Sequence, residues 1–272
     1  MKFSDVLLET MYFRDIEKAP SKWRDDLHKL VDRHPTVQEY DPERQYSPMD
    51  TFVIFGKGNI PSEKNTVIVG NKYHDKKRQY AKLKGKVNTI ETYTDALEVK
   101  GKEFIAKRNI GEKQKGQLIN QLPDDPEAYI FQNLVKILAE FRVVTYYMNG
   151  EYHVSGIYKK SGSNVSVSQI STTSKLGVVL SKIAIKATKR LGYGLGGADI
   201  AIVGTKDLPS VVLGENVLGN ITSKATRLVG RLDAQELFEG EYPVVLEVNS
   251  FPSMSNPAIL FDLMKSIEKN RA

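Results

Sequence analysis

The stretch Pro243–Pro252, PVVLEVNSFP, decides the fold and the chemistry that we expect of this chain. Its apolar first half is typical of a buried strand, and successive side chains of a strand point to opposite faces. Glu247 and Asn249 should therefore project to one side, and Leu246 and Val248 into a core. A carboxylate and an amide oxygen at this spacing suit a Mg²⁺ ion that shares the phosphates of a nucleotide. A strand end with an exposed Glu and a turn-forming Asn would have the same sequence.

Length and composition limit the classes of protein to consider. With 272 residues, the chain is long enough for one large or two modest domains. Cysteine is absent, which excludes disulfides and thiolate chemistry and is compatible with a reducing cytoplasm. No stretch approaches the roughly 20 apolar residues of a membrane span. We therefore expect a cytoplasmic protein with no membrane segment.

The net charge of +6 is concentrated in two basic clusters, one between Lys72 and Lys86 and one between Lys102 and Lys115. Positive fields of this kind attract polyanions, which include nucleic acid and the triphosphate of a nucleotide. A solvated surface would have the same composition. The second cluster differs from the first because it surrounds a loop.

Hydrophobic patterning predicts alternating helices and strands. Residues 1–34 should be largely helical, and further helices should span 72–84 and the segment from the cap at Ser174 to Gly192. The pair Asn149-Gly150 indicates a tight hairpin turn. Strands are predicted at 51–55, 66–69, 104–106, 129–135, 142–148, 152–158, 198–203 and 244–248.

Three groups of polar residues follow the predicted strands. Lys107 ends a strand and enters a loop with two glycines, where an ammonium and backbone N–H groups can lie over phosphates. Glu140 and Arg142 share a strand face, and an arginine fork there can hold a phosphate or a carboxylate, although an ordinary ion pair would look the same. Asp199 begins a strand that would complete a metal site if it lay beside Glu247; a turn aspartate is the alternative.

In this order, the motifs resemble those of the ATP-grasp superfamily and are most similar to its RimK-like ligases. The resemblance covers residues 65–255 and rests on Asn71-Lys72, Phe104-Ile105-Ala106-Lys107, Phe131-Gln132-Asn133-Leu134-Val135, Glu140-Phe141-Arg142-Val143, Ala198-Asp199-Ile200 and Leu246-Glu247-Val248-Asn249-Ser250-Phe251-Pro252-Ser253.

The resemblance implies an α+β protein with the ATP-grasp fold, in which two α+β subdomains clamp ATP behind a small α/β preATP-grasp region. The expected boundaries are 1–70 for the N-terminal region, 71–135 for the first subdomain and 136–272 for the second. The long stretch 206–242 between the metal-bearing strands departs from the family, and we expect an ordered insertion there.

The same resemblance assigns roles to individual residues. Lys72 and Lys107 would contact phosphates, and residues 132–135 would be the hinge that binds adenine. Arg142 and Lys159 would be the catalytic residues that steady the γ-phosphate or a substrate carboxylate. The remaining assignments are Gln132, Asn133, Leu134, Val135 and Glu140 for the nucleotide, and Asp199, Glu247 and Asn249 for Mg²⁺, as two ions.

The reaction implied is ATP-dependent joining of a carboxylate to an amine through an acylphosphate. Two alternatives stay open. An ATP-grasp kinase would use the same phosphate and metal apparatus, and a nucleic-acid-binding or nucleic-acid-modifying protein would use the basic face from Lys72 to Lys115. The acyl donor and the amine acceptor are not identified by the sequence.

Overall fold

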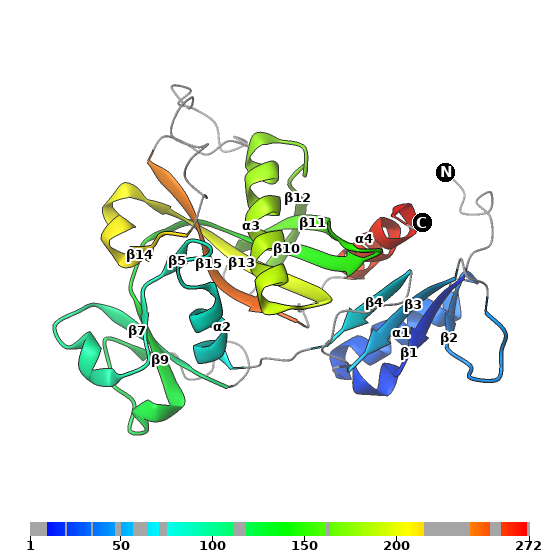
Figure 1. The fold of residues 1–272 in the computed structure, drawn as a ribbon, viewed down its shortest axis with the longest axis horizontal. Helices are drawn as coiled ribbons and strands as arrows, with labels where there is room; N and C mark the ends of the chain where they lie inside the picture. Colours follow the sequence, from blue (N-terminus) through cyan, green and yellow to red (C-terminus); the bar gives the residue numbers. More distant parts are fainter. Residues whose placement is uncertain are drawn as a thin grey trace.

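The structure is a computed structural model that describes residues 10–19, 21–33, 35–46, 50–56, 65–70, 75–110, 118–161, 164–214, 240–250 and 257–270. The strands of this part of the chain form an N-terminal sheet, a large central sheet and a small sheet (Figure 1). Helices lie against these sheets, so the architecture is α+β. Within the described ranges, no helix is both long and apolar enough to cross a membrane.

The N-terminal sheet has the order β2-β1-β3-β4, and every pairing in it is parallel. Its elements are β1 (Met11–Arg14), the 3₁₀ turn η2 (Ile16–Lys18), α1 (Ser21–Arg33), β2 (Val37–Glu39), β3 (Thr51–Phe55) and β4 (Thr66–Val69). The prediction of helix through residues 1–34 is therefore wrong at Met11–Arg14. Met11, Tyr12 and Phe13 are all buried, because a parallel strand covered on both faces carries a continuous apolar run.

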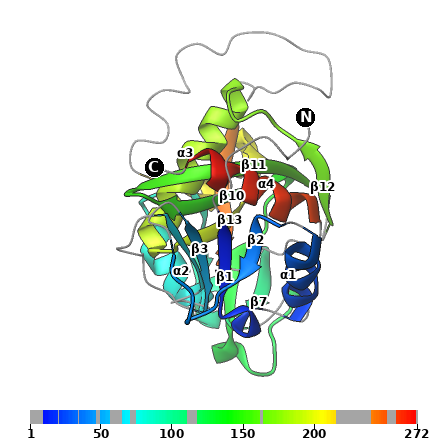
Figure 2. The same ribbon diagram turned by 90° about the vertical axis from the view of Figure 1, so that its right-hand side faces the viewer.

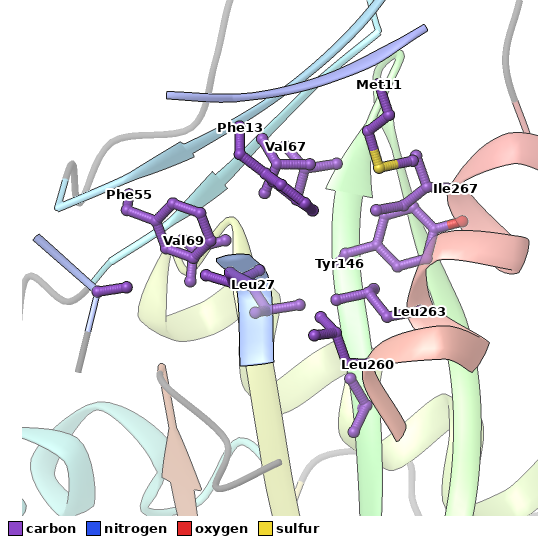
Figure 3. Close-up of a cluster of buried hydrophobic side chains, with 14 of the residues drawn as sticks. Met11, Phe13, Leu27, Phe55, Val67, Val69, Tyr146, Leu260, Leu263 and Ile267 are labelled. Atoms are coloured by element: carbon purple, nitrogen blue, oxygen red, sulfur yellow. The ribbon is translucent and has the colours of Figure 1, made fainter. Parts of the chain in front are cut away.

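The N-terminal sheet is fixed to the rest of the molecule by a shared core (Figure 3). Phe13, Val67 and Val69 of this sheet belong to the same buried cluster as Tyr146 of the large sheet. Helix α4 (Pro257–Lys269) contributes Leu260, Leu263 and Ile267, and Figure 2 shows it beside β10 and β11. The backbone N–H of Asn65 also donates to the side-chain oxygen of Asn149 at 2.7 Å.

The large sheet has the order β12-β11-β10-β13-β15-β5-β14. Helix α3 (Lys175–Leu191) covers one face; it is capped by Ser174, whose hydroxyl accepts from Gly177, and ends at Gly192 in a left-handed conformation, as predicted. Helix α2 (Lys76–Leu83) lies next to α3. The strands are β5 (Thr89–Ile90), β10 (Ile137–Met148), β11 (Glu151–Ser161), β12 (Asn164–Gln169), β13 (Leu195–Gly204), β14 (Val211–Val212) and β15 (Glu241–Asn249).

The small sheet has the order β6-β9-β7-β8 and its own apolar cluster around Phe104 and Phe131. Its elements are β6 (Thr92–Tyr93), η3 (Ala96–Val99), β7 (Phe104–Arg108), β8 (Leu118–Ile119), η4 (Pro126–Ala128) and β9 (Tyr129–Asn133). The expected subdomain 71–135 differs from this unit, because β5 pairs with β14 and β15 of the large sheet. Residues 75–90 thus belong with the large sheet.

The expected insertion at 206–242 is described only at its ends. Residues Thr205–Ser210 form the 3₁₀ turn η5, β14 follows, and β15 begins at Glu241. Residues 215–239 of the expected insertion lie outside the described residues.

The cap of α3 gives a test of this packing. Ser174→Ala removes the acceptor for the Gly177 N–H, and we expect it to lower the free energy of unfolding by about 1 kcal/mol in urea denaturation. Thr172→Ala, at an exposed position just before the cap, is the control and should leave the urea midpoint unchanged. Equal effects of the two substitutions would contradict the assignment of the cap.

Candidate active site

The face of the large sheet opposite α3 is divided along its strands into three zones. At one end, Val144 and Tyr146 pack on the N-terminal sheet and α4. At the other end, Ala201, Val203 and Val244 form an apolar cluster with Ile90. Polar and charged side chains lie between them, and we call this group the charged belt: Glu140, Arg142, Lys160, Asp199, Glu247 and Asn249.

The register of the strands brings the belt together. Arg142 on β10 is opposite Asp199 on β13, and Asp199 is opposite Glu247 on β15. Residues directly opposite each other on neighbouring strands point to the same face, so the three side chains form one row. Asn249 lies on the same face as Glu247, because the two are separated by one residue of the same strand.

A β-bulge at Leu246 interrupts the regular alternation of side chains that we expected along β15. Asp199 pairs with Glu247 but Ile200 pairs with Val245, so Leu246 is an extra residue on its strand. Val245 and Val248 both join the core under α3. Leu246 packs instead against the apolar cluster of Ile90 on the opposite face. The sequence correctly separated Glu247 from Val248 but placed Leu246 on the wrong side.

Asp199 is the centre of the belt. Its Oδ1 accepts from Nε of Arg142 at 2.8 Å, and its Oδ2 accepts from the other end of the guanidinium at 2.7 Å. Lys160 donates to Oδ2 of Asp199 at 2.8 Å and also to Glu140. Arg142 and Asp199 are only 5% and 1% exposed. Asp199 and Glu140 are thus each paired with a cation.

The pKa shifts of this group follow from burial and pairing. Burial alone would raise the pKa of Asp199, but the charges of Arg142 and Lys160 and their hydrogen bonds outweigh it and lower the pKa below its ordinary value. Burial would likewise lower the pKa of Lys160, yet Asp199 and Glu140 raise it. Pairing therefore favours the charged forms of both Asp199 and Lys160.

Lys160 is a member of the belt that the sequence did not predict, and Lys159 is the residue that was predicted in its place. Counted back from the Asn149-Gly150 turn, a regular hairpin would pair Glu140 with Lys159. The register shifts between Val144 and Thr145, and the structure pairs Glu140 with Lys160. Lys159 is exposed and pairs with Phe141, which faces the core under α3.

Across from the belt, a cavity lies where α2, the small sheet and β15 meet. It contains about 440 Å³ of space, part of it open to solvent. Helix α2 contributes Lys76, Gln79, Tyr80 and Leu83; the other lining residues are Thr89, Thr92, Lys107, Ile130, Gln132, Val245, Leu246 and Glu247.

Lys107 enters this cavity from β7. Its ammonium donates to the side-chain oxygen of Gln132 at 2.7 Å, and the Gln132 amide donates to the Thr92 hydroxyl at 3.3 Å. Burial lowers the pKa of Lys107, and the charge of Lys76 adds to this effect, whereas the charge of Glu247 opposes it. An anion in the cavity would offset the desolvation of this ammonium.

The predicted hinge residues have different surroundings. The Gln132 side chain lines the cavity, and Val135 packs against the apolar cluster of Ile90. The backbone N–H groups of Asn133 and Leu134 donate to the carbonyls of Glu91 and Glu103. Lys72 and loop residues 111–117 lie outside the described residues.

The donors that suit a metal ion are on β15. The amide of Asn249 donates to a carboxylate oxygen of Glu247 at 3.0 Å, so a half-turn of this amide would direct two oxygens at one cation. Within the described ranges, no three side chains of His, Cys, Asp or Glu come together as a metal site. Glu247 and Asn249 fit a Mg²⁺ ion that takes its other ligands from water and phosphate; Asp199, with both oxygens bonded to cations, does not.

No protein-family model matches the sequence, and no curated protein matches it either. Among solved structures, one similar to this chain is N5-carboxyaminoimidazole ribonucleotide synthetase from Thermotoga maritima. The match covers 96% of this chain and 75% of that protein, at 11% identity and a TM-score of 0.50. The match with D-alanyl-alanine synthetase A from Vibrio cholerae covers 97% of this chain and 100% of that protein, at 12% identity and a TM-score of 0.47. An ATP-grasp superfamily protein from Archaeoglobus fulgidus covers 71% and 76%, at 14% identity and a TM-score of 0.43. At these identities a likeness concerns the fold alone, and the likeness to the Thermotoga maritima structure shows that the chain has the α+β ATP-grasp fold.

The neighbouring lysines of β11 provide a test of the belt. Lys160→Gln removes a cation that serves Asp199 and Glu140, and we expect a loss of about 1.5–3 kcal/mol in the free energy of unfolding. Lys159→Gln, one residue away on the other face, should change stability by less than about 0.5 kcal/mol. A larger loss for Lys159→Gln in chemical denaturation would show that the register is not as described.

Proposed function

We propose that this chain is an ATP- and Mg²⁺-dependent ligase of the ATP-grasp superfamily, RimK-like in its motifs, that joins a carboxylate to an amine through an acylphosphate. The observation that carries the proposal is the position of the charged belt opposite Lys107 and Gln132. Lys107 and Glu247 come from different sheets and line one cavity. A nucleotide between these sheets would meet a cation on one side and metal-binding oxygens on the other.

In this proposal the nucleotide lies along the cavity from the hinge to the belt. Adenine would rest on Leu246 and Val135, because these side chains cover the apolar cluster of Ile90 next to the hinge. The phosphates would lie between Lys107 and Lys76, whose mutual repulsion an anion relieves. Lys72 is expected to add a further phosphate contact.

Glu247 and Asn249 would hold Mg²⁺, which when bound neutralises charge on the phosphates during transfer. Arg142 and Lys160 supply fixed positive charge in the same row of the sheet. A substrate carboxylate oriented by this charge would attack the γ-phosphorus, releasing ADP and forming an acylphosphate. An amine would then attack the acyl carbon, forming the amide and expelling phosphate.

Nothing in the described part of the structure favours the nucleic-acid alternative, and three lysines of the first basic cluster have other surroundings or partners. Lys76 lines the cavity, Lys77 donates to the carbonyl of Glu127, and Lys84 pairs with Glu91. The kinase alternative shares the whole apparatus, so an experiment must separate it from the ligase.

The decisive measurement is the trapping of the activated carboxylate. With ATP, Mg²⁺ and a panel of carboxylates, we expect hydroxylamine to yield a hydroxamate together with ADP, since it attacks the mixed anhydride in place of the amine. Glu247→Gln is the control and should abolish both products while keeping its fold by circular dichroism. A stable phosphoester with no hydroxamate would establish a kinase and reject the ligase.

The lowered pKa of Lys107 makes a second prediction, in which nucleotide affinity depends on pH. Phosphates bind the charged ammonium, so affinity should fall as pH rises through the lowered pKa, before the ordinary lysine value of 10.5 is reached. Lys107→Arg stays charged and should retain its affinity over the same range.

Two further variants test this contact, with the nucleotide affinity measured by titration calorimetry. Lys107→Ala should lose roughly 10–100-fold in affinity at neutral pH, whereas Lys82→Ala, on α2 outside the cavity lining, should bind normally. Equal losses for the two would mean that the general basic field, and not a contact, binds the nucleotide.

A further inference from the structure

We propose that Asp199 is a positioning residue that holds Arg142 and Lys160 in place, and that it is not a metal ligand, so that Glu247 and Asn249 provide a single Mg²⁺ site. The sequence pattern suggested three ligands and two ions, and the geometry points to a different division of roles. The metal half of this inference rests on the proposed function. The positioning half concerns the protein without metal or nucleotide.

The first observation is that the Asp199 carboxylate is already occupied. Oδ1 accepts one hydrogen bond from Arg142, and Oδ2 accepts one from Arg142 and one from Lys160, all within 2.8 Å. A Mg²⁺ ion would have to bind an oxygen at about 2.0–2.1 Å. At that distance it would lie against a guanidinium and an ammonium that are almost excluded from water, where repulsion between like charges is strong.

The second observation is the direction in which Asp199 leans. Its partners come from β10 and β11, on one side of β13. Glu247 and Asn249 are on β15, on the other side of β13, and bond to each other. The row therefore has two parts. On one side the Asp199 carboxylate lies between two cations, and on the other side Glu247 and Asn249 offer a pair of oxygen donors.

The third observation is the balance of charge. Within the charged belt and the nearby Lys107, the acids are Glu140, Asp199 and Glu247, and the cations are Arg142, Lys160 and Lys107. The three cations therefore already offset the three carboxylates before any metal or nucleotide binds. Glu247 keeps its carboxylate directed to the cavity, where a nucleotide would bring its own charge.

A positioning role also explains what Asp199 contributes to the chemistry. Arg142 is a long side chain that would otherwise sample many rotamers, and the bidentate contact fixes its planar fork. Lys160 is fixed by two acids in the same way. Positive charge that is fixed before the substrate arrives need not be reoriented during transfer.

The first measurement uses the metal-free full-length protein in EDTA. Asp199→Asn leaves a buried guanidinium without its counter-ion, and we expect the melting temperature to fall by roughly 5–10 °C. Glu247→Gln should melt within about 1 °C of the wild type. The double variant Arg142→Met/Asp199→Asn should melt higher than Asp199→Asn alone, because it removes the unpaired charge. A metal ligand with no positioning role would give no such recovery.

The second measurement is Mn²⁺ binding in the presence of a non-hydrolysable ATP analogue, followed by electron paramagnetic resonance. We expect one Mn²⁺ per protein–nucleotide complex. Asp199→Asn should keep its Mn²⁺ affinity within about twofold, whereas Glu247→Gln should lose at least about tenfold. If Asp199→Asn does not fold, the double variant takes its place.

Two Mn²⁺ ions per complex, or a loss for Asp199→Asn as large as that for Glu247→Gln, would overturn the single-site inference. An unchanged metal-free melting temperature for Asp199→Asn would overturn the positioning role. If the wild type binds neither the nucleotide analogue nor Mn²⁺, the proposed function and the single-site inference fail together, and the melting experiment still decides the positioning role.

Discussion

A carboxylate that is almost fully buried is stable in its charged form only if cations and hydrogen bonds replace the water that it loses. Asp199 meets this requirement by pairing with Arg142 and Lys160. The arrangement of the other charged side chains of the site depends on this pairing. Removing the Asp199 carboxylate would leave the buried Arg142 guanidinium without its counter-ion, at a cost of about 3–5 kcal/mol. The strands β10, β11 and β13 are consequently tied to one another by side chains as well as by their backbone hydrogen bonds.

The charged belt can exist at this depth because apolar packing closes the sheet on both sides of it. The N-terminal sheet and α4 cover one end of the face, and the cluster of Ile90 and Val244 covers the other. Glu247 of the belt lines the cavity on the side of the small sheet. The small sheet has its own apolar cluster around Phe131, and it presents Lys107 to the belt from that separate cluster.

Local sequence pattern predicted most of the elements but not the pairings between distant segments. The strands at 51–55 and 66–69, the hairpin at Asn149-Gly150 and the capped helix α3 are confirmed, because each depends on periodicity and turn chemistry within its own segment. The strand at Met11–Arg14 was missed because a strand buried on both faces lacks the alternation that identifies strands. The assignment of β5 to the large sheet depends on contacts with Val245, far along the chain.

The site shows the same limit at the scale of single residues. Arg142, Asp199 and Glu247 were predicted as a group, and the structure places them in one row, although their roles remain a proposal. Leu246 and Lys159 lie on other faces than a regular alternation of side chains would give, because β-bulges shift the register and a period of two residues cannot anticipate them. Each bulge adds one residue to its strand beside the belt, so the side chains beyond it point to the opposite face from the one that regular alternation gives. Without the bulge in β11, Lys159 would face Asp199; without the bulge in β15, either Glu247 or Val245 would have to change faces. The β-bulges are thus the features that the sequence pattern could not predict. They also place the charged belt on one face of the sheet, while the other face packs against an ordinary apolar core.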